Sequence, residues 1–73
     1  MTKTDPHTTP PLSPPAWVRW IAQDADGAWW GYSVEPLQYD RGWYENEVGR
    51  YVSLGRGEPN PQWRLSLRAV NRC

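Results

Sequence analysis

Several residue types are scarce or missing in this chain of 73 residues. It has no phenylalanine, one methionine, one cysteine and one histidine. A single cysteine excludes an intrachain disulfide, and one cysteine with one histidine cannot supply the ligand set of a structural zinc site. No apolar run approaches the roughly 20 residues that a membrane-spanning helix needs. We therefore expect no metal, no cofactor and no membrane insertion.

Neither sign of charge is in excess, because eight Lys and Arg residues balance eight Asp and Glu residues. General DNA binding needs a basic stripe, so a neutral total argues against it. His7 lies in a proline-rich stretch, which leaves Ser33, Ser53 and Ser66 without a histidine to activate them. The prediction is a protein that is not an enzyme and has no catalytic residues. The scarcity of cysteine and the lack of an apolar signal segment favour a cytoplasmic location.

Tryptophan and tyrosine are abundant instead, with six and four copies, all between Trp17 and Trp63. Both side chains combine a large apolar body with a polar tip, and both are enriched in binding faces. Bulky side chains also give a very small domain its core. The aromatic excess therefore predicts a binding face, a core, or both.

Proline marks the organisation of the chain, with five of the eight prolines in the first fifteen residues. Such a stretch cannot join a helix or a central strand. We expect a disordered or polyproline-like tail over 1–15 and a single Trp-rich domain over 16–73. Removal of the tail is expected to leave the melting temperature nearly unchanged.

Two runs rich in β-forming residues, 17–23 and 28–34, flank an Asp-x-Asp-Gly turn and predict a hairpin. A third strand is expected over 50–54, ended by the glycines at 55 and 57. Alternation along the hairpin displays Trp29, with room beside it at Gly31. The same alternation predicts inward side chains at Val18, Trp20, Trp30, Tyr32 and Val34.

The stretch 61–70 fits two structures. Asn60 followed by Pro61 favours the start of a helix, which would place Trp63, Leu67 and Val70 on one face. The same residues also alternate as a fourth strand would. The predicted fold is α+β and mainly β: a three-stranded antiparallel sheet with a short C-terminal helix. Its expected core is Trp20, Tyr32, Val52, Trp63 and Leu67.

The candidate site is the stretch 42–50, Gly-Trp-Tyr-Glu-Asn-Glu-Val-Gly-Arg, which is unusually aromatic for a loop. One interpretation is a recognition loop with aromatic anchors and directional polar contacts; the other is a loop that folds its aromatic rings over the sheet. With the displayed tryptophan of the hairpin, the predicted partner-binding residues are Trp29, Trp43, Tyr44, Asn46 and Arg50. An alternative is a nucleotide held by base stacking on tryptophan, with phosphate bound by Arg50, Arg64 and Arg68.

The predicted first strand has an open edge with one charge, Arg19, and no internal proline. Open edges favour association. A homodimer through this edge or through Trp29 is one expectation; a monomer whose proline-rich tail covers the edge is the other.

Three short patterns resemble small uncharacterised proteins of tailed bacteriophages and prophages, over Trp17–Val70. They are Trp-Val-x-Trp-Ile-Ala-x-Asp-x-Asp-Gly at 17–27, the stretch 42–50, and Asn-Pro-Gln-Trp-Arg-x-Ser-Leu at 60–67. The resemblance implies a phage accessory protein of the host cytoplasm, some relatives of which block host defences such as CRISPR–Cas. The expected function is binding and inhibition of a bacterial host protein, with an anti-CRISPR type of action as one form. The alternatives are a nucleotide-binding module or sponge, and a structural virion or assembly component.

Overall fold

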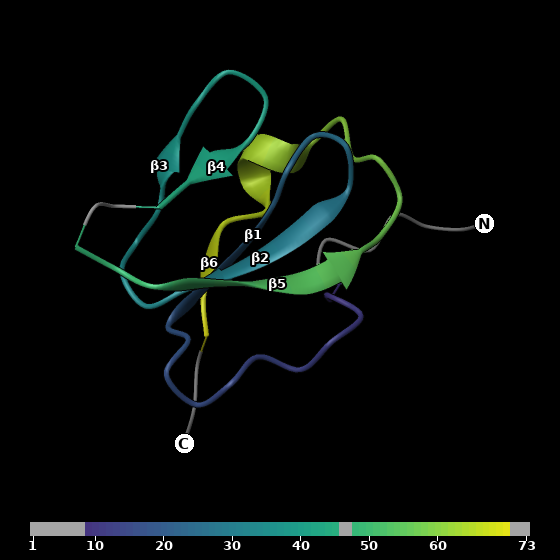
Figure 1. The fold of residues 1–73 in the computed structure, drawn as a ribbon. Helices are drawn as coiled ribbons and strands as arrows, with labels where there is room; N and C mark the ends of the chain where they lie inside the picture. Colours follow the sequence, from purple (N-terminus) through teal and green to yellow (C-terminus); the bar gives the residue numbers. More distant parts are fainter. Residues whose placement is uncertain (1–8, 46–47, 71–73) are drawn as a thin grey trace.

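The computed structural model describes residues 9–45 and 48–70, which form two antiparallel sheets (Figure 1). The larger sheet has the strand order β5-β2-β1-β6. Its strands are β1 (Trp20–Gln23), β2 (Ala28–Tyr32), β5 (Tyr51–Arg56) and β6 (Arg68–Ala69). The smaller sheet pairs β3 (Leu37–Gln38) with β4 (Trp43–Tyr44), and a 3-10 helix, η1 (Trp63–Leu65), precedes β6. A mainly-β fold is confirmed.

The β1–β2 hairpin forms where the Asp-Gly turn predicts it. Gly27 has a φ of +100°, and its N–H donates to the Asp24 carbonyl over 2.9 Å. A Cβ at Gly27 would also collide with the carbonyl oxygen of Gly57, so the turn requires glycine for two reasons. Both strands are shorter than predicted, since pairing runs only from Trp20 opposite Tyr32 to Gln23 opposite Trp29.

The predicted end of the third strand is wrong, because β5 continues through Gly55 to Arg56. Gly55 has a φ of +100°, and the register against β2 shifts between Ala28 and Trp30. A glycine at an irregularity of this kind bends the strand without ending it.

The predicted C-terminal helix is wrong, because no α-helix occurs within residues 9–45 and 48–70. Asn60 does start a turn, since its side-chain oxygen accepts from the Gln62 N–H over 2.8 Å. The Ser66 hydroxyl then stops the helix: it donates to the Trp63 carbonyl over 2.6 Å and accepts from the Gln23 N–H over 2.8 Å. The chain is thereby joined to β1, and the rival prediction of a fourth strand holds only for the two residues of β6.

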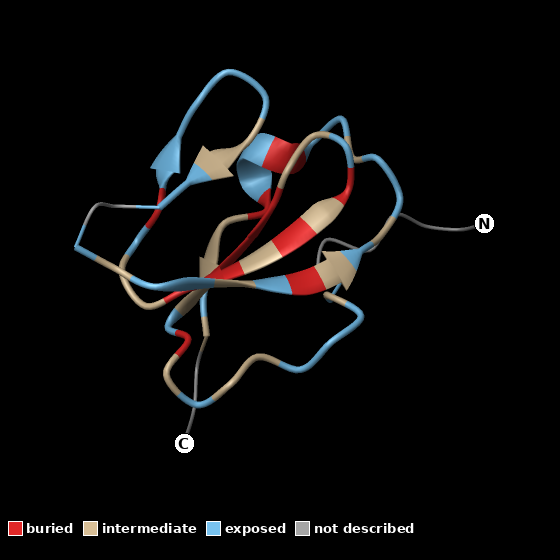
Figure 2. Cartoon of the chain, in the orientation of Figure 1, coloured by how far each residue is buried: buried red, intermediate tan, exposed pale blue. Residues whose placement is uncertain are grey.

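Buried residues occur in β1, β2, β5 and η1 (Figure 2), and the consecutive buried residues of β1 place parts of the core on both faces of the sheet. One buried cluster consists of Val18, Ile21, Trp29 and Leu54. The expectation that Trp29 is displayed is therefore wrong, since only 1% of it is exposed. The space expected at Gly31 is filled by the protein itself, because a Cβ there would lie 3.0 Å from both methyl carbons of Val18.

The remaining core predictions hold in part. Val18, Tyr32 and Trp63 are buried as expected. The others are half-buried: Trp20, Trp30, Val34, Val52 and Leu67. Alternation separates inside from outside only when one face of a sheet meets solvent, and here the consecutive residues Ile21 and Ala22 of β1 are both buried.

The N-terminal strap, residues 9–17, runs along the side of the sheet opposite the β3–β4 hairpin (Figure 1). The Leu12 N–H donates to the Leu54 carbonyl over 3.0 Å, and the Pro15 carbonyl accepts from Val18 over 3.0 Å. Pro11 lies so close to Gly55 that a Cβ there would be 2.9 Å from its ring. Pro11 and Leu12 thus contact β5, whereas a disordered or polyproline-like tail was predicted over 1–15; residues 1–8 lie outside the described part.

The prediction of an open edge at β1 is also wrong. This strand pairs with β2 on one side and with β6 on the other. The edges of the four-stranded sheet are β5 and β6. The structural reason for a dimer through the first strand is thereby removed, while the oligomeric state itself stays a prediction.

Candidate functional site

The β3–β4 hairpin forms the candidate site. Leu37 pairs with Tyr44 and Gln38 with Trp43, and the Tyr39 N–H donates to the Gly42 carbonyl over 2.8 Å to close the turn. The sequence analysis treated the part of this hairpin from residue 42 onward as a loop. Beside the turn lies a hollow of about 550 Å³, lined by Asp24, Tyr39, Asp40, Arg41, Gly42, Trp43 and Tyr44.

Trp43 fastens the hairpin to the main sheet. Its Nε1–H donates to the Gln23 carbonyl over 3.1 Å, and its backbone N–H donates to Asp24 Oδ1 over 2.9 Å. Its ring meets the ring of Trp63 edge to face, with the centroids 5.8 Å apart. Trp43 therefore folds over the sheet, as the second interpretation of the stretch 42–50 proposed.

Gly42 allows this attachment, because a Cβ at that position would lie 2.6 Å from Asp24 Oδ1. This distance is shorter than the contact between two non-bonded atoms allows, so a larger residue would displace the turn from the carboxylate of Asp24. Glycine at position 42 thus sets how near the hairpin lies to β1.

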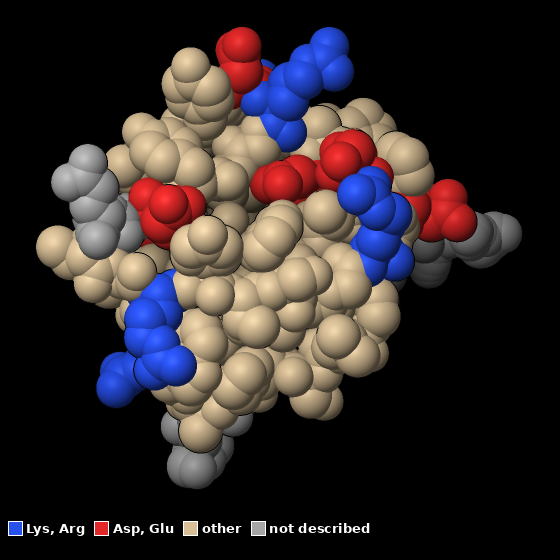
Figure 3. Space-filling model, viewed as in Figure 1, with Lys and Arg blue, Asp and Glu red and all other residues tan. Residues whose placement is uncertain are grey.

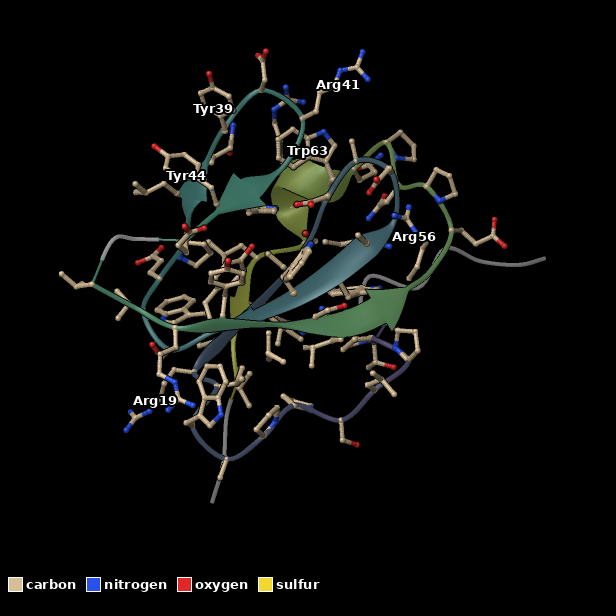
Figure 4. All side chains as sticks on the ribbon, viewed as in Figure 1. Arg19, Tyr39, Arg41, Tyr44, Arg56 and Trp63 are labelled. Carbon is tan, nitrogen blue, oxygen red and sulfur yellow. The ribbon has the colours of Figure 1, made fainter. Side chains whose placement is uncertain are left out.

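Tyr39 and Tyr44 are the displayed aromatic residues of the hairpin, with exposed fractions of 69% and 45%. Their rings meet edge to face with centroids 5.6 Å apart, and Figure 4 shows them together at one side of the hairpin. The sequence reasoning chose Tyr44 but missed Tyr39. A short turn containing Gly42 between the pairs Leu37–Gln38 and Trp43–Tyr44 was the signal that could have found it.

Asp24 brings a half-buried carboxylate to the hollow. Burial raises the pKa of this carboxyl above its ordinary value, and the charge of Asp26 adds to the effect, while the hydrogen bond from the Trp43 N–H opposes it. Among residues 9–45 and 48–70 no ion pair reaches Asp24; the ion pair nearby joins Arg56 to Asp26 over 3.2 Å. Asp24 therefore has no ion-pair partner among the described residues, and Arg56 attracts its carboxylate only at longer range.

The three arginines predicted to bind phosphate lie over three different tryptophan rings. Arg50 is 4.2 Å from the centroid of Trp17, and Arg64 is 4.6 Å from that of Trp63. Arg68 lies 5.7 Å from the centroid of Trp29. None of the three lines the hollow at the hairpin, or a second hollow of about 640 Å³ that also borders Trp43.

The other predicted contacts are not gathered at the hairpin. Trp29 is buried, and Asn46 lies outside the described residues. Figure 3 shows a broad uncharged area over the four-stranded sheet, with charged groups around its rim. On this sheet Tyr51, which is 53% exposed, pairs with the half-buried Trp30 at a centroid distance of 5.8 Å.

Within residues 9–45 and 48–70, no helix is long and apolar enough to cross a membrane. No group of three or more His, Cys, Asp or Glu side chains within the same ranges is placed to hold a metal ion.

Comparisons with protein-family models, with curated proteins and with solved structures found no match to this chain. The resemblance to phage proteins stays a prediction.

Proposed function

We propose that this chain is a non-enzymatic phage accessory protein that binds a bacterial host protein through the β3–β4 hairpin and inhibits it. The observation that carries the proposal is the exposed Tyr39–Tyr44 pair beside a hollow of about 550 Å³. Exposed aromatic side chains next to a concave surface are typical of interface hot spots.

The hairpin is held in place before any partner arrives. Trp43 has two hydrogen bonds to the turn between β1 and β2 and a ring contact with Trp63. A surface that is already ordered loses less conformational entropy on binding, so more of the contact energy appears as affinity. The hairpin is thus better suited to binding than a free loop of the same sequence.

The bacterial partner and the inhibition rest on the phage resemblance over Trp17–Val70. The geometry suits inhibition by covering a surface of the partner, because the displayed tyrosines project from a small sheet. An action as an inhibitor of a defence system such as CRISPR–Cas is one form of this proposal.

Nucleotide binding has less support from the geometry. Stacking on Tyr39 or Tyr44 would contribute about 1–3 kcal/mol per base. The hollow, however, contains Asp24 and Asp40, which repel phosphate, and the arginines proposed for phosphate lie on tryptophan rings outside it. No feature of the described residues specifically favours a virion or assembly role.

The test is capture from a bacterial lysate with the tagged full chain. The variant Tyr39→Ala/Tyr44→Ala removes the displayed pair, and Tyr51→Ala is the matched control because it removes an exposed tyrosine of the other sheet. We expect the same protein to be retained by the wild type and by Tyr51→Ala, and to be lost with the double variant. The retained protein is then assayed for activity with and without the chain.

Retention that does not depend on Tyr39 and Tyr44 would contradict the proposal, as would no retained protein. Tryptophan fluorescence against a panel of nucleotides checks the alternative. Quenching at micromolar nucleotide that disappears in the double variant would favour the nucleotide-binding function instead.

A further inference from the structure

We infer that the hollow beside the β3–β4 hairpin takes an arginine side chain from the protein partner. The inference rests on the proposed function, because it names the chemistry that the partner must bring to the same surface. Two properties of the hollow favour arginine: its aromatic rings and its acidic side chains.

Three aromatic side chains line the hollow: Tyr39, Trp43 and Tyr44. A guanidinium group over an aromatic face is attracted by the electrons of the ring, and its planar shape stacks where an ammonium group does not. The protein already uses this contact internally, with arginines over Trp17, Trp29 and Trp63. Within residues 9–45 and 48–70, no such arginine lies over Trp43.

The charge of the hollow favours a cation. Asp24 and Asp40 both line it, and neither has an ion pair among the described residues. Burial of this carboxylate is unfavourable and holds the pKa of Asp24 above its ordinary value, because the hydrogen bond from the Trp43 N–H and the attraction of Arg56 offset it only in part. A partner guanidinium would compensate this charge and donate hydrogen bonds to it.

Among residues 9–45 and 48–70, Arg41 is the one cation that also lines the hollow. Figure 4 shows its side chain extending away from Tyr39 and Tyr44, beyond the turn of the hairpin. Arg41 is exposed, so it can stay in solvent while the space between the tyrosines and Asp24 is filled. A neutral occupant would instead remove solvent from Asp24 without compensating its charge.

The experiment is an NMR titration of the full chain with N-acetyl-arginine amide, followed through the backbone amides. N-acetyl-citrulline amide is the matched control ligand, because a urea of nearly the same shape replaces the charged guanidinium. We expect saturable shifts confined to residues 24 and 39–44 with the arginine derivative, at millimolar concentration. Binding of the citrulline derivative should be about tenfold weaker, since the cation–ring attraction and the charge-assisted bonds are lost.

Variants locate the site. Tyr44→Ala and Asp40→Asn change exposed residues and should each weaken binding of the arginine derivative several-fold, whereas Tyr51→Ala should leave it unchanged. Asp24→Asn is the sharpest variant, but Asp24 also holds the Trp43 N–H, so its fold is checked by its amide spectrum. Asp40→Asn keeps the test decisive if Asp24→Asn does not fold.

Equal binding of the citrulline derivative, absence of shifts at residues 24 and 39–44, or full binding by Tyr44→Ala would each overturn the inference. Equal binding of N-acetyl-lysine amide would overturn the assignment to arginine and leave a site for cations in general. Tyrosine-dependent capture of a host protein together with a failed arginine titration would retain the proposed function and reject only this inference. A positive titration without any captured protein would reject the proposed function alone.

Discussion

The tryptophan residues are mainly structural. Trp29 and Trp63 are buried, and Trp43 is tied to the carbonyl of Gln23. The Nε1 atom of Trp29 is buried without a hydrogen-bond partner in the described part of the chain, and Arg68 lies over its ring. The displayed aromatic surface therefore comes mostly from tyrosine: Tyr39, Tyr44 and Tyr51.

Replacing Trp63 with alanine should strongly destabilise the protein. The side chain is 4% exposed and packs edge to face on Trp43, so its loss leaves a cavity under the candidate site. We expect the free energy of unfolding to fall by about 3–5 kcal/mol in a denaturant titration. Leu65→Ala is the control in the same 3-10 helix, because Leu65 is 79% exposed and should change stability by less than about 0.5 kcal/mol. Similar losses in both variants would show that the ring is not docked.

The titration of Asp24 should change how the free energy of unfolding depends on pH. Its pKa in the folded protein lies above 3.8, the value for a free side chain, so the folded state binds this proton more tightly than the unfolded state. Stability from this group is therefore lost as pH rises from 3.8 through the raised pKa. The free energy of unfolding of Asp24→Asn, minus that of the wild type, should increase with pH across that window and then level off.

Asp26→Asn gives a control of opposite sign. The hydrogen bond from the Ala28 N–H lowers the pKa of Asp26, with Arg56 adding to the effect, so this carboxylate stabilises the fold above 3.8 and loses that contribution as pH falls through the lowered pKa. The difference between Asp26→Asn and the wild type should therefore decrease with rising pH. Parallel curves for the two variants would show that burial of Asp24 is not the cause.

At the scale of elements, two segments without long regular structure complete the fold. The β3–β4 hairpin has two-residue strands and is held by Trp43, while the strap has no regular structure and is held by Leu12 and Pro15. Short strands gain little from their own ladder, so tertiary contacts must supply the rest. Each element therefore depends on a few contacts with β1 or β5.

Removal of the strap should destabilise the domain, contrary to the expectation for a free tail. A chain that starts at Ala16 loses the hydrogen bonds of Leu12 and Pro15 and the contact of Pro11 with Gly55. We expect a loss of about 1–3 kcal/mol in thermal or denaturant unfolding. A chain that starts at Thr9 keeps all of these contacts and is the matched control. Equal stability of the two truncated chains would show that the strap contributes nothing.

At the scale of the whole molecule, the edges of the larger sheet are partly protected. β6 has only two residues, and the strap covers β5 at Leu54. Short and covered edges reduce association between sheets. This arrangement favours the monomer of the two assembly states that the sequence left open.

The full chain should therefore have a mass near 8.5 kDa in light scattering at increasing protein concentrations. The chain that starts at Ala16 should show a mass that rises with concentration, because the carbonyl of Leu54 and the edge beside it become open. A full chain with twice the mass at all concentrations would instead support the homodimer, through a surface other than β1.

Local sequence patterns specify a few elements of this fold. The Asp-Gly turn specifies the β1–β2 hairpin, because only glycine at position 27 fits both the positive φ and the nearby carbonyl oxygen of Gly57. The stretch 50–54 predicts most of β5, and the predicted burial of Tyr32 and Trp63 is confirmed. Within the candidate site the same reasoning reached Trp43 and Tyr44 but could not tell the attached ring from the displayed one.

Which surfaces are covered depends on contacts between residues that lie far apart in the sequence. Three features depend on residues that are distant in the sequence: the burial of Trp29, the 3-10 turn before β6 and the position of the Trp43 ring. Gln23 shows the reason: its backbone N–H binds Ser66, its side chain binds the Glu58 carbonyl and Asn60, and its carbonyl binds Trp43. A buried polar residue must find partners for all its groups, and partners up to 43 residues away are invisible to any local pattern. The side of the sheet that each aromatic ring takes follows from these long-range bonds.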